Sequence, residues 1–236
     1  MNIFSIKEAL KFGWETTKKN FWFLVGLTFL VWIVGYLPQI VDGMGKGSAA
    51  GLVTIASWLL AAWVQLGAVR ILLALVDGKP VSFALLKQTD TRGYIAYLAA
   101  SVLVGIMVGV GMIIFIIPGV IVALAVGMYG YRIVDAKAGV IDSIKQSAAI
   151  TRGHRWQLFG LALMMVLLNI LGAIVVGLGL LVTVPVTMLA HAYAYRKLTS
   201  VLEPVVVSAP PRPAFLDGSQ QAPAIPNMPS AGSAAN

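Results

Sequence analysis

Long apolar runs recur along the chain, and they constrain its fold more than any other feature. The runs are each about twenty residues long and almost free of charged side chains. They cover Phe21–Val41, Ala50–Val76, Tyr94–Ile117, a stretch from Gly119 to about Val134, Gln157–Val176 and Leu178–Tyr195. A helix of this length crosses a bilayer, and the runs lack the polar/apolar alternation of a membrane β-barrel. The sequence therefore predicts an all-α polytopic bundle of six transmembrane helices, in which each backbone group finds its partner within its own helix.

The composition agrees with a membrane protein and excludes several kinds of site. The 236 residues are 59% hydrophobic and 11% charged, whereas an average soluble domain has about 25% charged residues. There is no cysteine, so no disulfide or thiolate metal site is possible. With two histidines and scattered acidic residues, we expect no metal and no cofactor.

Basic residues are distributed very unevenly between the segments that join the apolar runs. Sixteen of the seventeen Lys and Arg residues fall on one side of the predicted membrane, and Lys46 alone falls on the other. Positively charged loops stay in the cytoplasm, so both chain termini are predicted to be cytoplasmic. This arrangement accounts for the net charge of +8, and nucleic-acid binding is not needed to explain it.

Three units share one plan, in which a short amphipathic segment precedes a pair of apolar runs. The units cover about 1–78, 79–135 and 136–203, and together they form one predicted membrane domain, 1–203. Units one and three match at a constant offset of 134 residues, which aligns Trp22 with Trp156 and Leu24 with Leu158. Residues 204–236 are rich in Pro, Ala and Ser, and they predict a disordered cytoplasmic tail.

The segments before runs one, three and five have two interpretations. They are amphipathic helices at the membrane interface, with basic residues toward anionic headgroups, or they are ordinary cytoplasmic helices that pack on the bundle. The first interpretation is favoured, because Trp22, Tyr97 and Trp156 follow these segments as aromatic anchors do.

Seven basic residues are candidate ligands for lipid headgroups, because they lie near predicted span ends or just inside an apolar run. They are Lys18, Lys19, Arg70, Arg92, Arg132, Arg152 and Arg155. Arg70 lies about five residues inside its run, where it either binds a phosphate or extends its side chain to the interface. The second explanation is favoured for Arg70.

Four polar residues inside the runs are candidate binding residues, because such residues are rare in membranes and often functional. They are Gln65, Asn169, Thr187 and His191. The alternative is that they form hydrogen bonds between helices or fill packing positions, and it is favoured for Asn169 and His191. No acidic residue lies in the middle of a run and the common enzyme motifs are absent, so we expect no catalytic activity.

The motifs around runs four to six resemble those of a known group of proteins. IIPGVIVAL (Ile116–Leu124), AGVIDSIKQSAAITRGHRWQLFGL (Ala138–Leu161) and VPVTMLAHAYAYRKL (Val184–Leu198) are similar to bacterial six-span membrane proteins of largely unknown function. That group includes the membrane domain attached to some glycerophosphoryl diester phosphodiesterases. The resemblance implies the architecture and the bacterial inner (cytoplasmic) membrane, but not the phosphodiesterase activity, because this chain lacks that domain.

Three functions are therefore considered. The first is a non-catalytic organising or accessory protein that contacts anionic lipids, with a homo-oligomer or a protein partner, the latter through the tail. The second is a transporter or channel for a small solute, and the third is a lipid-modifying enzyme. A water-filled cavity lined by Gln65, Asn169 and Thr187 would favour transport, and a dry bundle would favour the accessory role.

Overall fold

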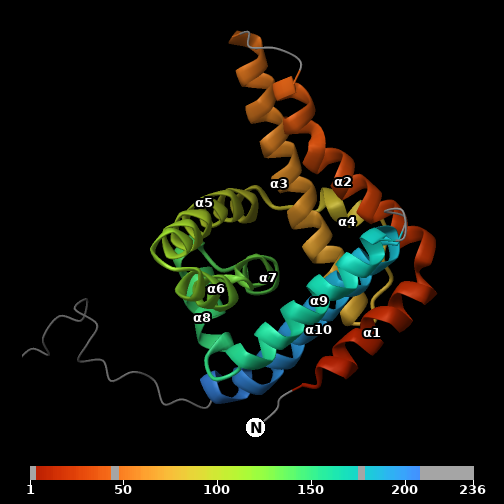
Figure 1. Cartoon of the computed structure of the whole chain (residues 1–236), viewed down its shortest axis with the longest axis vertical. Coiled ribbons are helices and arrows are strands. Elements are labelled where there is room, and N and C mark those ends of the chain that lie inside the picture. Colours follow the sequence, from red (N-terminus) through yellow and green to blue (C-terminus); the bar gives the residue numbers. More distant parts are fainter. Residues whose placement is uncertain (1–3, 44–47, 175–178, 208–236) are drawn as a thin grey trace, which may run out of the picture.

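The computed structural model describes residues 4–43, 48–174 and 179–207, and every regular element in these ranges is a helix (Figure 1). In chain order the helices are α1 (Ile6–Lys19), α2 (Phe21–Gly43), α3 (Ser48–Val76), α4 (Ala84–Lys87), α5 (Thr91–Ile114), α6 (Ile116–Val126), α7 (Tyr129–Ala136), α8 (Val140–Thr151), α9 (Arg155–Ile174) and α10 (Leu180–Val207). The all-α prediction is thus confirmed for the described residues. Most of the predicted tail, 208–236, lies outside them, and α10 continues past the predicted boundary at residue 204.

Among the residues that the structure describes, five helical stretches are long and apolar enough to cross a membrane, which is the mark of a multi-pass membrane protein. They are Phe21–Ile40, Gly51–Val76, Thr91–Ile114, Ile116–Ala136 and Arg155–Ile174. Each coincides with one of the first five predicted runs. The sixth predicted run lies in α10, which is not among these five.

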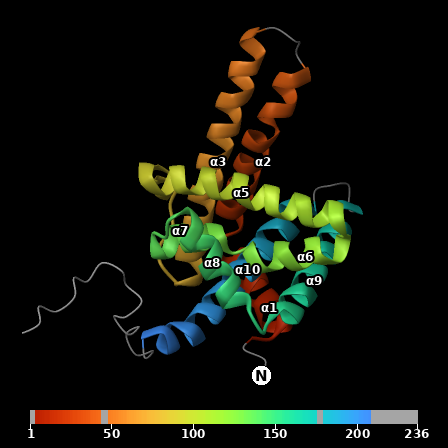
Figure 2. The ribbon, with the colours of Figure 1, turned by 90° about the vertical axis from the view of Figure 1, so that its left-hand side faces the viewer.

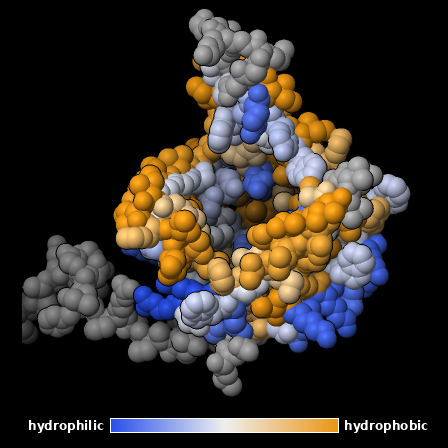
Figure 3. All heavy atoms as spheres, viewed as in Figure 1, coloured by the Kyte–Doolittle hydropathy of each residue, from blue (hydrophilic) through white to orange (hydrophobic). Residues whose placement is uncertain are grey.

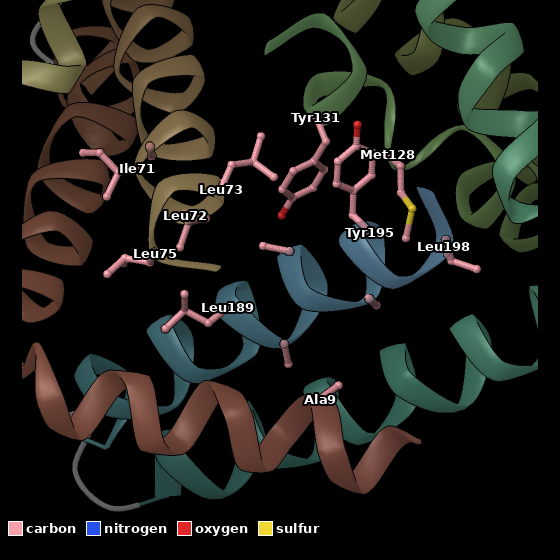
Figure 4. Packing of buried hydrophobic residues seen from close by; sticks show 14 of the residues in the cluster. Ala9, Ile71, Leu72, Leu73, Leu75, Met128, Tyr131, Leu189, Tyr195 and Leu198 are labelled. Atoms are coloured by element: carbon pink, nitrogen blue, oxygen red, sulfur yellow. The ribbon is translucent and has the colours of Figure 1, made fainter. Parts of the chain in front are cut away.

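Helix α10 is the centre of the molecule, and this explains its more polar sequence. It contacts α1, α2, α3, α8 and α9, and its residues Leu189, Ala190 and Leu198 are completely buried. Figure 4 shows Leu189 and Leu198 within this packing. Small residues such as Ala192 and Ala194, also fully buried, let the neighbouring backbones approach closely. A helix enclosed by protein does not need the uniformly apolar surface that lipid demands.

The helical hairpins cross one another instead of forming a parallel bundle. Figure 2 shows α2 and α3 standing upright while α5 and α6 run across them. The turn between α5 and α6 lies at the extended residue Phe115, three residues before the predicted Pro118-Gly119 turn. Pro118 falls in the first turn of α6, where its missing N–H removes no helical hydrogen bond. The turn predicted between runs five and six falls largely on residues 175–178, outside the described residues.

The fourth predicted run is broken into two helices, and α8 stabilises the break. Residues 127–128 separate α6 from α7, which frees backbone groups that a continuous helix would pair. Ser147 accepts a hydrogen bond from the Met128 N–H (3.1 Å) and donates one to the Ala125 carbonyl (2.9 Å). Thr151, one turn further along α8, donates to the same carbonyl at 3.2 Å. All these groups are buried, so the two hydroxyls take the place of the missing helical partners.

Helix α1 packs on α10, as the second interpretation of the amphipathic segments expects. Ala9, Gly13 and Thr17 form its buried face. A Cβ atom on Gly13 would lie 2.4 Å from the Val186 carbonyl oxygen, so the two backbones touch at this glycine. The outer face of α1 carries exposed charges, including the Lys11–Glu15 pair at 3.9 Å.

The other two amphipathic segments differ from α1. In the second unit the segment forms only the single turn α4, where Leu86 lies against Gly67 of α3. In the third unit it forms α8, whose side chains Ser143, Ile144 and Ile150 are buried. Both segments therefore pack on protein over much of their length.

Residues that correspond between predicted units one and three have similar helical positions and similar exposure. Helices α1 and α8 begin at Ile6 and Val140, and α2 and α9 begin at Phe21 and Arg155, so both pairs keep the offset of 134 residues. Trp22 and Trp156 are both largely exposed, at 83% and 86%. Their neighbours Leu24 and Leu158 are both buried.

Candidate functional site

Three charged residues meet where α3, α7 and α10 come together. Arg196 donates to Asp77 at 2.7 Å and to both carboxylate oxygens of Asp135 at 2.8 Å. The three side chains are 20–27% exposed. Asp77 lies in the first predicted unit, Asp135 in the second and Arg196 in the third, so one guanidinium contacts residues from all three predicted units.

Further polar groups extend this ion-pair network toward α8. The Tyr195 hydroxyl donates to Asp135 at 2.8 Å, and Arg132 donates to Tyr195 at 3.4 Å and to Gln146 at 2.8 Å. Burial alone would lower the pKa of Arg196, but hydrogen bonds and charges from the two aspartates outweigh burial and raise it. The network therefore holds its charges in place, and both carboxylates are already paired.

A pocket opens beside this network, between α7, α9 and α10. Its volume is about 350 Å³ and it is lined by Tyr131, Ala162, Met165, Val166, Asn169, Thr187, Met188 and His191. Figure 3 shows this face of the molecule hollowed between α3, α7 and α9, with hydrophilic residues visible at depth. Three of the four polar residues proposed from the sequence thus line one pocket. The fourth, Gln65, is an exposed residue of α3 and does not line it.

The polar groups of the pocket are partly satisfied. Asn169 donates through Nδ2 to the Thr187 hydroxyl at 3.4 Å, and Thr187 donates to the Val184 carbonyl at 2.9 Å. Tyr131 and His191 share a hydrogen bond of 3.2 Å between the hydroxyl and Nδ1. The Asn169 Oδ1 atom is buried and has no partner among the described residues.

A second hollow is an apolar groove of about 560 Å³ between α6 and the first turn of α9. Its walls are Ile116, Ile117, Val120, Ile121, Leu124, Trp156 and Phe159, and Arg155 is the charged residue that lines it. The Arg155 Nε atom is buried and has no partner in the part of the chain that the structure describes. Arg155 is one of the lipid-headgroup candidates, whereas the groove beside it is a feature that no local sequence signal marked.

The other basic candidates are dispersed. Arg70 donates to the backbone carbonyl of Gln88 at the end of α4, and Arg132 is held in the ion-pair network. Lys18 lies 4.8 Å from the centre of the Trp14 ring. Three more candidates are exposed and lie on different helix ends, namely Lys19, Arg92 and Arg152. The structure thus does not gather the seven basic residues into one site.

Residues 110–201 match a sequence family described as a protein of unknown function (DUF975). The uncharacterised protein Mb2590 of Mycobacterium bovis is 29% identical over 169 residues, which make up 69% of this chain and 51% of that protein. The uncharacterised protein Rv2560 of Mycobacterium tuberculosis shows the same identity over the same shares. The chain therefore spans about half the length of the curated relatives it matches. No solved structure matches the chain.

These similarities agree with the resemblance to bacterial proteins of unknown function. The matched stretch includes the α6–α7 break, the α8 hydroxyls, both hollows and Arg196. No activity comes to this chain from its relatives, so its function has to be inferred from the geometry of these sites.

Proposed function

We propose that the chain is a non-catalytic membrane protein with an organising or accessory role, and that it holds a lipid with an anionic headgroup. The observation that carries this proposal is the apolar groove between α6 and α9, which has the unpaired Arg155 Nε beside it. Ile116 and Ile117 are more than 70% exposed in this groove. Exposed apolar walls of this kind suit an acyl chain.

The charge at the groove complements a lipid phosphate. A guanidinium forms short, strong hydrogen bonds to phosphate oxygens, and such a bond would satisfy Arg155. Trp156, which is 86% exposed, is the kind of residue that sits at headgroup level. The groove and Arg155 together therefore match a molecule with an apolar tail and an anionic head.

The proposal includes six membrane crossings in a bacterial cytoplasmic membrane, with both termini in the cytoplasm. Its support is the one-sided distribution of basic residues. The fourth crossing requires α6 and α7 together, because the 11 residues of α6 extend about 16 Å, and a bilayer core is about 30 Å thick. The sixth crossing would be the enclosed helix α10.

Cysteine labelling tests this topology, because the chain has no cysteine of its own. In spheroplasts, a membrane-impermeant maleimide should label Lys46→Cys and leave Lys197→Cys unlabelled until the membrane is opened. Labelling of both positions from outside would contradict the proposed topology.

Two further features belong to the same proposal. The outer face of α1, with Lys18 and Lys19, would contact anionic headgroups as an interfacial helix does. The matching helix starts of units one and three support descent from a repeated unit. The proposed relation to the membrane domain of glycerophosphoryl diester phosphodiesterases rests on the motifs in Ile116–Leu124, Ala138–Leu161 and Val184–Leu198. A protein partner or a second copy would complete the accessory role.

Native mass spectrometry of the full chain in its own membrane patches tests the lipid site. The wild type should retain an anionic phospholipid, and Arg155→Gln should lose it. Arg152→Gln is the matched control, since Arg152 is exposed three residues away and does not line the groove. Equal retention by all three proteins, or loss in both variants alike, would remove the basis for this lipid site.

Transport of a small solute is the second candidate function, and the pocket lined by Asn169, Thr187 and His191 favours it. Purified protein in liposomes should then release an enclosed solute faster than empty liposomes do. Asn169→Leu should abolish that release if the pocket lies on the path.

A further inference from the structure

We propose that the pocket between α7, α9 and α10 binds a small uncharged molecule that carries hydroxyl groups. Nothing in the family match or in the relatives' names assigns a ligand to this chain. The site is also separate from the lipid groove, since the two hollows share no lining residue.

The size of the pocket calls for a molecule larger than water. One buried water needs roughly 10–15 Å³, and pockets that hold small-molecule ligands begin at about 300 Å³. The observed volume of about 350 Å³ lies at the lower end of that range. A polyol or a monosaccharide is of suitable size.

The unpaired oxygen of Asn169 favours a ligand that can donate a hydrogen bond. A buried polar atom without a partner is costly, and most buried polar atoms in proteins have one. Asn169 cannot turn this atom toward Thr187 without losing its Nδ2 bond there. A ligand O–H group would satisfy the oxygen while leaving the Asn169–Thr187 contact in place.

His191 provides the second recognition point. Its Nδ1 atom is paired with the Tyr131 hydroxyl, so Nε2 is the ring nitrogen left for a ligand. In a neutral imidazole, Nε2 is a donor when Tyr131 donates to Nδ1, and an acceptor when Nδ1 donates to Tyr131. A hydroxyl group serves as either donor or acceptor, and it therefore fits both tautomers as well as the acceptor on Asn169.

The lining also discriminates against charge. The eight residues that line the pocket include no Asp, Glu, Lys or Arg. An ionic ligand would lose its hydration without gaining a counter-charge. Met165, Val166 and Met188 instead offer apolar contact to the carbon skeleton of a polyol.

Protection of a single thiol tests the proposal in the full chain reconstituted in nanodiscs. Ala162→Cys places the sole cysteine on the pocket wall, and its reaction with N-ethylmaleimide is timed with glycerol, myo-inositol, glucose or inorganic phosphate present. At least one of the three polyols should slow labelling, about tenfold at ten times its Kd, and phosphate should not. Ser200→Cys, exposed and away from the pocket, should react at the same rate throughout.

Three variants in the Ala162→Cys background complete the test. Asn169→Leu should abolish protection by the polyol, whereas Gln65→Leu, which removes an exposed amide outside the pocket, should leave it unchanged. Asn169→Leu should also unfold at the same temperature as the parent or a higher one, since it removes an unpaired oxygen. His191→Phe provides a second loss of protection if Asn169→Leu folds poorly.

Three outcomes would overturn the proposal. The first is that no polyol protects the thiol, and the second is that phosphate protects it as well as the polyols do. The third is that protection survives both Asn169→Leu and His191→Phe. Because none of these measurements reports on the groove beside Arg155, which shares no lining residue with the pocket, their failure would leave the proposed lipid site unaffected.

Discussion

At the scale of single residues, the two hydroxyls of α8 show how one side chain can replace a backbone partner. Ser147 is fully buried and bonds both the Ala125 carbonyl and the Met128 N–H. Ser147→Ala should therefore lower the free energy of unfolding by about 1–3 kcal/mol, because it leaves the Met128 N–H buried and unpaired. Thr151 still bonds the Ala125 carbonyl and limits the loss. The measurement is unfolding in mixed detergent–SDS micelles.

Ser143→Ala is the matched control for this prediction. Ser143 is equally buried on the same helix, but its hydroxyl bonds the Val140 carbonyl within its own first turn. Removing the Ser143 hydroxyl should change the free energy of unfolding by at most about 1 kcal/mol. Equal effects of the two substitutions would show that Ser147 does not stabilise the α6–α7 break.

Sequence reasoning identified single residues unevenly. Asn169, Thr187 and His191 were candidates because polar residues in apolar runs are costly, and the structure brings these three together. Gln65 met the same criterion, but it is exposed on α3. The criterion failed here because the position of a residue along an apolar run does not show which side of the helix faces protein. The groove beside Arg155 was not foreseen, because it forms only where α6 packs beside the first turn of α9, and both helices contribute its walls.

At the scale of helices, the contact of α1 with α10 depends on one glycine. A Cβ atom on Gly13 would come within 2.4 Å of the Val186 carbonyl oxygen, and backbone atoms cannot move aside as a flexible side chain does. Gly13→Ala should cost about 1–3 kcal/mol of stability, as overpacking usually does. Gly35→Ala in α2 is the control, because its Cβ would meet nothing within 4 Å.

The control should be neutral or stabilising by up to about 1 kcal/mol, since alanine favours helix over glycine. Thermal unfolding of the two variants in the same detergent gives the comparison. If Gly13→Ala proves as stable as Gly35→Ala, α1 does not pack closely on α10 in the detergent-solubilised protein.

The bounds of a helix could be predicted where one uninterrupted apolar run forms a single helix. Runs one, two and five agree with α2, α3 and α9 to within a few residues. The fourth run failed this rule, because its break at residues 127–128 is stabilised from outside by Ser147 and Thr151, which lie some twenty residues later. The turn between α5 and α6 lies at Phe115, three residues before the position predicted from Pro118. Proline is tolerated in the first turn of a helix, so Pro118 lies inside α6 and does not mark the turn.

At the scale of the whole molecule, one ion-pair network joins residues from the three predicted units. Its bonds link residues that are 61 and 119 positions apart in the chain, so no local sequence pattern predicts the network. The shared plan of the three predicted units does indicate which residues could form the network. Asp77, Asp135 and Arg196 each stand at or just beyond the end of the second, fourth or sixth apolar run. An alignment of the ends of these three runs places two acidic residues and one basic residue at equivalent positions, which is the composition of an ion pair shared by two carboxylates.

Removing the shared guanidinium is the sharpest test of this network. Arg196→Gln leaves Asp77 and Asp135 without their common partner. Breaking a fully buried pair costs about 3–5 kcal/mol, and exposed pairs contribute about 0–1. Because these side chains keep 20–27% of their exposure, we expect a loss of about 1–3 kcal/mol. Lys197→Gln, at an exposed neighbouring position, should change stability by less than about 0.5 kcal/mol.

A double-mutant cycle then shows whether the loss comes from the uncompensated carboxylates. Asp77→Asn and Asp135→Asn together remove both acidic charges, so adding Arg196→Gln to that background should cost distinctly less than it costs in the wild type. The same cycle at high salt should change little, because partly buried pairs are weakly screened. If Arg196→Gln costs the same in both backgrounds, the guanidinium stabilises the molecule by packing, and the three units are joined by their apolar contacts with α10.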